Sequence, residues 1–332
     1  MLKKTNSNYL MPLNNINIHM HENKYTGCLL GSAIGDALGM QTEGMTSIEI
    51  RQYYKYIYDF GPGRPGSTNE KMRPGQYTDD TEQTLILARS IIKSRSFDPE
   101  LFSKELAKYS EKIISNPELN RGWGKTSLTA CKRLLEGIHW KESGVDIPTC
   151  GSAMRVSPIG LVFCDKPDEL EKYAVLSSLP THKNLQSIAG AVAVATAVSL
   201  AGINTSPDSI IRLSAEFASK YDPVLSNKIK NIGSLKNMNE INAFSIIGTS
   251  VLAIDVVPSA LYCFARYPLD FTRTILTGVN AGGDTDSIAA IAGAISGAYL
   301  GKDAIPQKWL DGLENSKQIE SIAPELNQMS GS

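Results

Sequence analysis

Glycine recurs at every fourth position in two segments near opposite ends of the chain, and this spacing restricts how the chain can fold. The positions are Gly27, Gly31, Gly35 and Gly39 in the first segment and Gly293, Gly297 and Gly301 in the second. On a helix, residues four apart share a face, so each series forms a stripe without side chains that another backbone can approach. Since glycine destabilises a helix interior by about 1 kcal/mol relative to alanine, we expect close helix contacts to compensate. For Gly39, a second explanation is that it ends its helix.

Most other segments also show helical rather than strand periodicity. Between Thr81 and Lys93, apolar residues recur with a period close to that of a helix. Three further segments follow the same pattern, at residues 187–200, 208–220 and 287–300. By contrast, residues 60–76 are dense in glycine and proline, which is typical of a loop. Because no series of alternating β-branched runs is present, the sequence predicts an all-α fold.

The composition excludes several classes of protein. The 332 residues are 42% hydrophobic and 20% charged, which is typical of a folded protein. A net charge of -1 provides no basic field for nucleic acid, and five scattered cysteines without a C-x-x-C pair favour neither a disulfide framework nor a zinc knuckle. The apolar run from Ile188 to Ile203 is shorter than the roughly 20 residues of a membrane-spanning helix. We therefore expect a buried helix there and no membrane partner.

The first 24 residues differ from the rest of the chain. They are rich in asparagine, with scattered apolar residues and two histidines, and we interpret residues 1–24 as an arm that precedes a single domain at residues 25–330. No long apolar stretch follows the two N-terminal lysines, as a signal peptide would require. The expected location is therefore cytoplasmic.

Two acidic segments carry the clearest chemical signal. Residues 77–82 read YTDDTE and residues 280–287 read NAGGDTDS, each directly before a predicted helix. Each segment places two carboxylates and a hydroxyl at a helix N-terminus, where the macrodipole and free N–H groups stabilise anions. One oxygen is enough to cap a helix, so ordinary capping does not account for four aspartates. Gly282 and Gly283 would let the second loop approach the cluster without a Cβ clash.

If the two helix ends converge, four carboxylates would repel one another strongly unless cations neutralise them. Two hydroxyls join them to give six oxygen ligands of the type that hard divalent cations prefer. These residues are Thr78, Asp79, Asp80, Asp284, Asp286 and Ser287. Two Mg²⁺ or Mn²⁺ ions, about 3.5–4 Å apart as in other paired sites, would position water or substrate hydroxyls. The sequence therefore predicts a binuclear metal site.

Five segments, in order and with compatible spacing, resemble those of the ADP-ribosyl-glycohydrolase family, over roughly residues 25–301. They are Gly31–Gly39 (GSAIGDALG) with Glu43 after it, Thr78–Thr81 (TDDT), Gly151–Gly160 (GSAMRVSPIG), Thr181–His182, and Gly282–Ser287 (GGDTDS). One such motif alone is weak, whereas five in order are specific. The resemblance implies a compact multi-helix orthogonal bundle with the binuclear site inside it, and it places Thr181–His182 at the start of a helix.

The resemblance also implies roles for individual residues. Asp80 and Glu43 would relay protons, with the general acid and general base not assigned between them. Substrate would be bound by Gly151, Ser152, Ala153, Met154, His182 and Trp123. The backbone N–H groups of the first four would bind a diphosphate, and His182 would contact ADP-ribose. Trp123 is either a stacking platform or a buried core residue, and Arg155 is either a phosphate clamp or a structural arginine.

The implied activity is a metal-dependent hydrolysis that removes ADP-ribose from a modified protein, with two Mg²⁺ or Mn²⁺ ions as cofactors. Arginine is the implied acceptor, because Cys150 stands where many members have asparagine and is similar to the arginine-specific branch. One alternative is hydrolysis of O-linked serine ADP-ribose or of a free ADP-ribose derivative. Another is an immunity protein whose N-terminal arm also blocks an ADP-ribosyltransferase toxin.

Overall fold

The structure, a computed structural model, describes residues 20–330, and within that range the chain forms helices and two isolated β-bridges but no strand. The α-helices are α1 (Glu22–Gly39), α2 (Ser47–Tyr54), α3 (Asp79–Ser94), α4 (Pro99–Ser115), α5 (Lys125–Leu135), α6 (Trp140–Ser143), α7 (Ser157–Val162), α8 (Pro167–Ser178), α9 (Leu185–Gly202), α10 (Pro207–Ala218), α11 (Pro223–Lys230), α12 (Ile232–Leu235), α13 (Glu240–Ile247), α14 (Ala253–Arg266), α15 (Phe271–Val279), α16 (Thr285–Leu300), α17 (Gln307–Gly312) and α18 (Ser316–Asn327). Short 3₁₀ helices are η1 (Met40–Thr42), η2 (Pro117–Leu119) and η3 (Lys302–Ala304). The prediction of an all-α fold is confirmed.

The two glycine stripes pack against each other along α1 and α16. A Cβ atom added at Gly27, Gly31 or Gly35 would overlap a backbone carbonyl of α16, at Gly297, Gly293 and Ala289 respectively. Gly39 fits both explanations given for it, because it ends α1 and because a Cβ there would lie 2.5 Å from the Cα of Asp286. The contact therefore holds the C-terminal end of α1 against the first turn of α16, which carries the second acidic motif.

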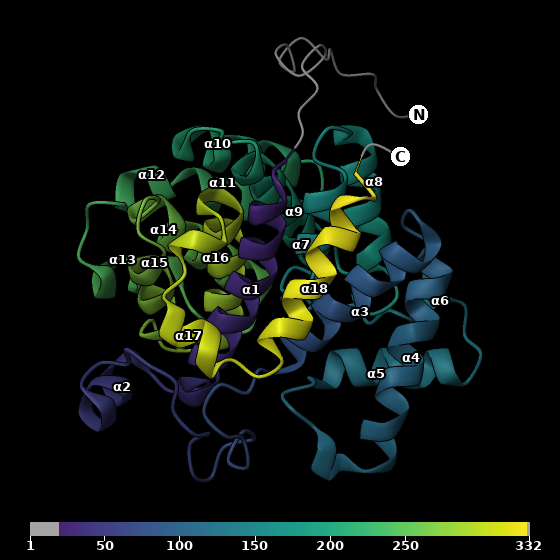
Figure 1. The fold of residues 1–332 in the computed structure, drawn as a ribbon, viewed down its shortest axis with the longest axis horizontal. Coiled ribbons are helices and arrows are strands. Elements are labelled where there is room, and N and C mark those ends of the chain that lie inside the picture. Colours follow the sequence, from purple (N-terminus) through teal and green to yellow (C-terminus); the bar gives the residue numbers. More distant parts are fainter. Residues whose placement is uncertain (1–19, 331–332) are drawn as a thin grey trace.

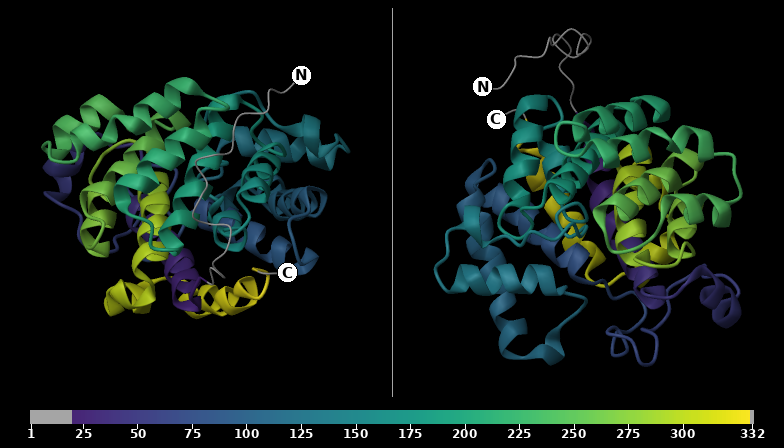
Figure 2. Two further views of the ribbon diagram at one scale, coloured as in Figure 1. Left: turned by 90° about the horizontal axis from the view of Figure 1, so that it is seen from above. Right: turned by 180° about the vertical axis from the view of Figure 1, so that it is seen from behind.

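The remaining helices surround this pair. Helices α4 to α6 lie on one side of the molecule and α10 to α15 on the other, with α1, α16 and α18 between them (Figures 1 and 2). The segment that contains α2 and the glycine- and proline-rich residues 60–76 lies near the C-terminal end of α1 (Figure 1). This end also holds the first turn of α16.

The predicted helices and the predicted loop agree with the structure to within a few residues. Helix α9 is long and apolar enough to cross a membrane by length and composition, but 89% of its 18-residue window is buried inside the fold. It packs among α7, α8, α10 and α16. A core helix passes the same test, so the prediction of a buried helix is confirmed.

The predicted boundary between arm and domain lies too late in the chain. Helix α1 already begins at Glu22, and Met20 is buried with its side chain against Gly202 at the end of α9. Residues 20–24 therefore belong to the packed domain, while residues 1–19 of the predicted arm lie outside the described residues. The partner-blocking hypothesis for the arm concerns those residues and is not addressed by the fold.

Candidate active site

A cavity of about 290 Å³ opens where the N-termini of α3 and α16 meet. Its lining residues are Glu43, Asp79, Asp80, Gly122, Gly124, Lys125, Thr126, Ser127, Thr149, Cys150, Gly151, Met154, His182, Val251, Asp284, Asp286 and Ser287. The structure therefore brings the two acidic motifs together around one space, as the sequence predicts. Four predicted site residues are buried and do not line it, namely Thr78, Ser152, Ala153 and Trp123.

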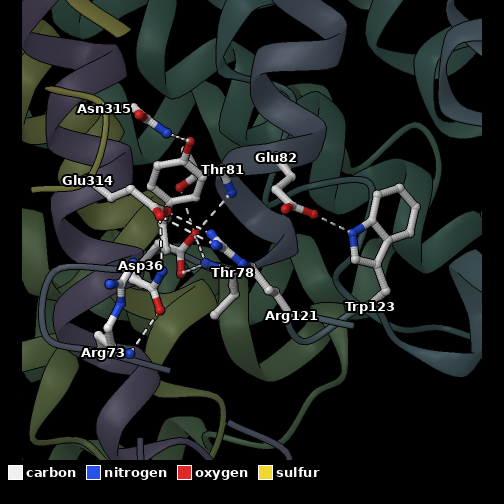
Figure 3. A network of polar contacts seen from close by, with 11 residues as sticks. Asp36, Arg73, Thr78, Thr81, Glu82, Arg121, Trp123, Glu314 and Asn315 are labelled. Carbon is white, nitrogen blue, oxygen red and sulfur yellow. Dashed lines mark hydrogen bonds and ion pairs between the residues drawn. The ribbon is translucent and has the colours of Figure 1, made fainter. Parts of the chain in front are cut away.

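The first acidic motif is held in place by Asp36, a buried aspartate of α1. Its carboxylate accepts hydrogen bonds from the backbone N–H groups of Thr78 (2.9 Å) and Thr81 (3.0 Å) and from the Thr81 hydroxyl (2.6 Å) (Figure 3). Thr78 caps α3, and Asp79 and Asp80 occupy its first turn. Burial raises the pKa of Asp36 to about 6, while these donors oppose the shift. Asp36 thus fixes the start of α3 relative to α1.

The second motif is tied to the segment that carries Glu43. The N–H of Gly44 donates to the Gly283 carbonyl (2.9 Å), and the N–H of Gly283 donates to the Met45 carbonyl (2.7 Å). Gly283 has a φ of 75°, a left-handed conformation that favours glycine. Through this pairing, oxygen atoms of Glu43, Asp284 and Asp286 lie within 4.8 Å of one another. Glu43, expected only to relay protons, is therefore also placed to hold a cation.

The charge of the cavity fits divalent cations. Among the described lining residues, five are carboxylates and Lys125 is the one cationic side chain. Burial, followed by repulsion from neighbouring carboxylates, raises the pKa values of Asp79, Asp80 and Asp286 well above the usual range. The Oδ2 atom of Asp80 is buried without a hydrogen-bond partner among the described residues. An unpaired buried carboxylate oxygen is costly, so this donor set fits the predicted Mg²⁺ or Mn²⁺ ions.

The predicted diphosphate-binding turn is only partly available. The N–H groups of Ala153 and Met154 both donate to the Cys150 carbonyl, at 2.7 and 3.1 Å. This corrects the prediction that they bind a ligand, because a tight turn has already used them. The N–H groups of Gly151 and Ser152 make no hydrogen bond to another residue in the described range. Of the two residues, Gly151 lines the cavity and Ser152 is buried directly behind it in the chain.

His182 is a neutral part of the cavity wall, and both of its ring nitrogens contact hydroxyl groups. Its Nδ1 lies 2.8 Å from the Thr181 hydroxyl and its Nε2 lies 3.0 Å from the Thr149 hydroxyl. Burial, together with the charge of Arg155, lowers the pKa of His182 to about 3, so the ring carries no charge at neutral pH. It does not open a helix as expected: α9 begins at Leu185, capped by Asn184.

Arg155 is a structural arginine and not a phosphate clamp at the cavity. It is fully buried, and its Nη1 donates to Gln83 (2.6 Å), whose amide donates to the Asp79 carboxylate (2.6 Å). Its Nη2 donates to the hydroxyl of Thr181 (2.6 Å), which contacts His182. The guanidinium therefore connects the acidic cluster to the His182 wall, and within residues 20–330 it has no direct carboxylate partner.

Trp123 is buried behind the cavity rather than exposed within it. Its indole N–H donates to Glu82 (2.7 Å), as Figure 3 shows, and its ring stacks on Tyr109 with centroids 5.8 Å apart. Of the two alternatives, the structure therefore favours the core residue. The neighbouring Gly122, with a φ of 89°, lines the cavity where Trp123 does not, and it lies against Asp79.

Three residues contribute to this site in ways that sequence reasoning did not assign to them. Asp36 belongs to the GSAIGDALG segment, so a motif contained it although no role was assigned. The Cys150 thiol lies 3.2 Å from Asp284 and 3.6 Å from Ser287, and it faces the acidic cluster. Asn69 donates to Glu43 (2.5 Å) from within the predicted loop, and nothing in the local sequence distinguishes it from a turn residue.

Comparison of the sequence and the fold with known proteins identifies the class of protein to which this fold and site belong. A model of the ADP-ribosylglycohydrolase family matches residues 18–332, so the chain belongs to that family. The chain is 39% identical to an uncharacterised protein of Archaeoglobus fulgidus, over 93% of this chain and 97% of that one. It is 29% identical to the human ADP-ribosylhydrolase ARH3, over 92% and 93% respectively. A solved structure described as an ADP-ribosylglycohydrolase-related protein complex superposes with a TM-score of 0.77 at 27% identity, covering 93% of this chain and 98% of that chain.

Proposed function

We propose that this protein is a metal-dependent hydrolase that releases ADP-ribose by cleaving its bond to a modified protein side chain or to another leaving group. The observation that carries the proposal is the convergence of five carboxylates from Glu43 and the two acidic motifs on one cavity, beside the Gly151 turn and His182. Family membership supports chemistry on ADP-ribose linkages, and the acidic donor set supports the dependence on cations.

The cavity offers a separate surface for each part of the substrate. The free N–H group of Gly151, which lines the cavity, is suited to a diphosphate, since backbone donors favour anions. His182, uncharged and held by two hydroxyls, provides a rigid neutral wall for a ribose or base. The carboxylates of the acidic motifs would hold the two Mg²⁺ or Mn²⁺ ions, which when bound supply Lewis acidity and orient water and hydroxyl groups.

Glu43 is the better placed of the two predicted proton-transfer residues. It is half-buried and lines the cavity, whereas Asp80 is 2% exposed. Burial, followed by the charge of Asp284, raises the pKa of Glu43 to about 7, near the pH at which a group both takes up and gives back a proton readily. We therefore assign proton relay to Glu43, in addition to its place in the acidic cluster that would hold a cation, and cation binding alone to Asp80. Cleavage of a glycosyl bond would pass through an oxocarbenium-like transition state.

Hydrolysis of ADP-ribosylated peptides tests the proposal directly. We expect the purified protein to release ADP-ribose when Mg²⁺ or Mn²⁺ is present, and to lose this activity when EDTA removes the cations. Parallel peptides modified on arginine and on serine separate the two linkages. Faster release from arginine would support the interpretation of Cys150, while faster release from serine would favour the alternative. No release from either peptide, or from free ADP-ribose derivatives, in the presence of cations would contradict the proposal.

Trp123 provides a test of the cavity wall. Because its indole faces Glu82 and Tyr109 and not the cavity, we expect Trp123→Phe to leave kcat/KM within about threefold of wild type, less than about 1 kcal/mol. Loss of the bond to Glu82 should lower the free energy of unfolding by about 1–3 kcal/mol, since a largely buried carboxylate loses a donor. A steep rise in KM for Trp123→Phe without loss of stability would instead indicate that Trp123 stacks on the substrate.

A further inference from the structure

Glu43 owes its position to a residue far from both acidic motifs. The Nδ2 atom of Asn69 lies 2.5 Å from the Glu43 Oε2 atom and 3.3 Å from the Met40 carbonyl oxygen. An amide nitrogen has two N–H donors, and these two acceptors use both. Because both partners are acceptors, they also determine which end of the amide faces Glu43. The bond leaves Oε1 of Glu43 without a hydrogen-bond partner among the residues described.

The loop at residues 60–76 is built to present Asn69 in this way. Asn69 is 1% exposed, although its neighbours Thr68 and Glu70 are exposed. The N–H of Gly63 donates to the Met72 carbonyl (2.9 Å), and a Cβ at Gly63 would overlap the Asn69 carbonyl oxygen. Turn formation alone does not explain a buried side-chain amide that donates to two acceptors from a loop rich in glycine and proline, since turn residues are normally solvated.

We propose that Asn69 is a positioning residue for Glu43: it binds one oxygen of the carboxylate and thereby holds the carboxylate group beside Asp284 and Asp286. This rests on the proposed function, because it takes the cluster of Glu43, Asp284 and Asp286 as a cation site. Partners that orient a ligating carboxylate typically contribute tenfold to hundredfold in metal affinity. The oxygen of the Asn69 amide, Oδ1, is itself buried and has no hydrogen-bond partner among the described residues.

Binding of Mn²⁺, followed by isothermal titration without substrate, tests this role independently of catalysis. We expect Asn69→Ala and Asn69→Ser to bind Mn²⁺ about tenfold more weakly than wild type, because a serine side chain is shorter and its hydroxyl offers only one donor. The matched control is Thr68→Ala, an exposed neighbour on the same loop, which should bind as wild type does. Two substitutions at Asn69 guard against misfolding, which circular dichroism would reveal in either.

A double-mutant cycle with Glu43→Gln shows whether Asn69 acts through Glu43. We expect Asn69→Ala to add nothing to the loss caused by Glu43→Gln, so that the double variant binds Mn²⁺ as the Glu43→Gln protein does. Equal weakening by Asn69→Ala in both backgrounds, or no weakening in either, would overturn the inference while leaving the proposed function intact. Failure of the wild-type protein to bind Mn²⁺ would overturn the cation site and, with it, this role for Asn69.

Discussion

Asp80→Asn is expected to abolish hydrolysis while leaving the metal-free fold at least as stable as wild type. Asp80 lies in the first turn of α3, its Oδ2 is buried without a partner, and neighbouring carboxylates act with burial to raise its pKa. Residues that only hydrogen-bond to a metal ligand contribute up to about a hundredfold to metal affinity or activity. Asp80 is proposed to be a ligand itself, so its loss should lower the activity by more than that.

The effect on stability follows from the sign of the pKa shift. A carboxyl whose pKa is raised in the folded state destabilises the fold as the pH rises from its ordinary value of 3.8 through the raised value. Asparagine has nearly the same shape and no charge, so it removes this penalty at neutral pH. Thermal unfolding in EDTA should give a Tm for Asp80→Asn equal to or above that of wild type.

Adding Mg²⁺ separates loss of the site from loss of the fold. A ligand at a hundred times its Kd stabilises a protein by about 2.7 kcal/mol, so wild type should unfold at a higher temperature with Mg²⁺ than in EDTA, and Asp80→Asn should not. Asp168→Asn is the matched control, since Asp168 is an exposed aspartate in the first turn of α8. A variant at Asp80 that keeps its activity, or responds to Mg²⁺ as wild type does, would show that Asp80 holds no cation.

The sequence was informative wherever the controlling interaction was local. Helix periodicity and the glycine- and proline-rich loop depend on neighbours within a few residues, and both were predicted correctly. The acidic motifs were recognisable because each exceeds what capping a helix requires. Their convergence was implied by the family resemblance and not by the motifs themselves, since no residue in either motif specifies its distance from the other.

The interactions that sequence reasoning missed span long distances along the chain. Asn69 and Glu43 are 26 positions apart, and Cys150 and Asp284 are 134 apart. The backbone donors of Ala153 and Met154 were misjudged because a tight turn and an anion-binding loop have the same glycine- and serine-rich composition. Only the described conformation shows which N–H groups a turn has already used.

The α1–α16 contact ties this site to the core of the fold, and a single methyl group should disrupt it. In Gly35→Ala, the new Cβ would overlap the carbonyl group of Ala289, and backbone atoms of a buried helix cannot move aside as a flexible side chain can. Alanine gains about 1 kcal/mol of helix propensity over glycine, but overpacking costs about 1–3 kcal/mol and occasionally more. We expect the clash to dominate and the free energy of unfolding to fall by about 2 kcal/mol or more.

Gly233→Ala is the matched control, because Gly233 lies in helix α12, is exposed, and has nothing within 4 Å of the added Cβ. Urea unfolding should show Gly233→Ala to be as stable as wild type or up to about 1 kcal/mol more stable. Since Gly39 and Thr285 join the same two helices at the site, through the Thr285 hydroxyl bonded to the Gly39 carbonyl (2.9 Å), Gly35→Ala should also weaken Mn²⁺ binding. Equal stability of the two alanine variants would mean that the helices separate easily, and the glycine stripe would then not be what holds the acidic motif of α16 against the end of α1.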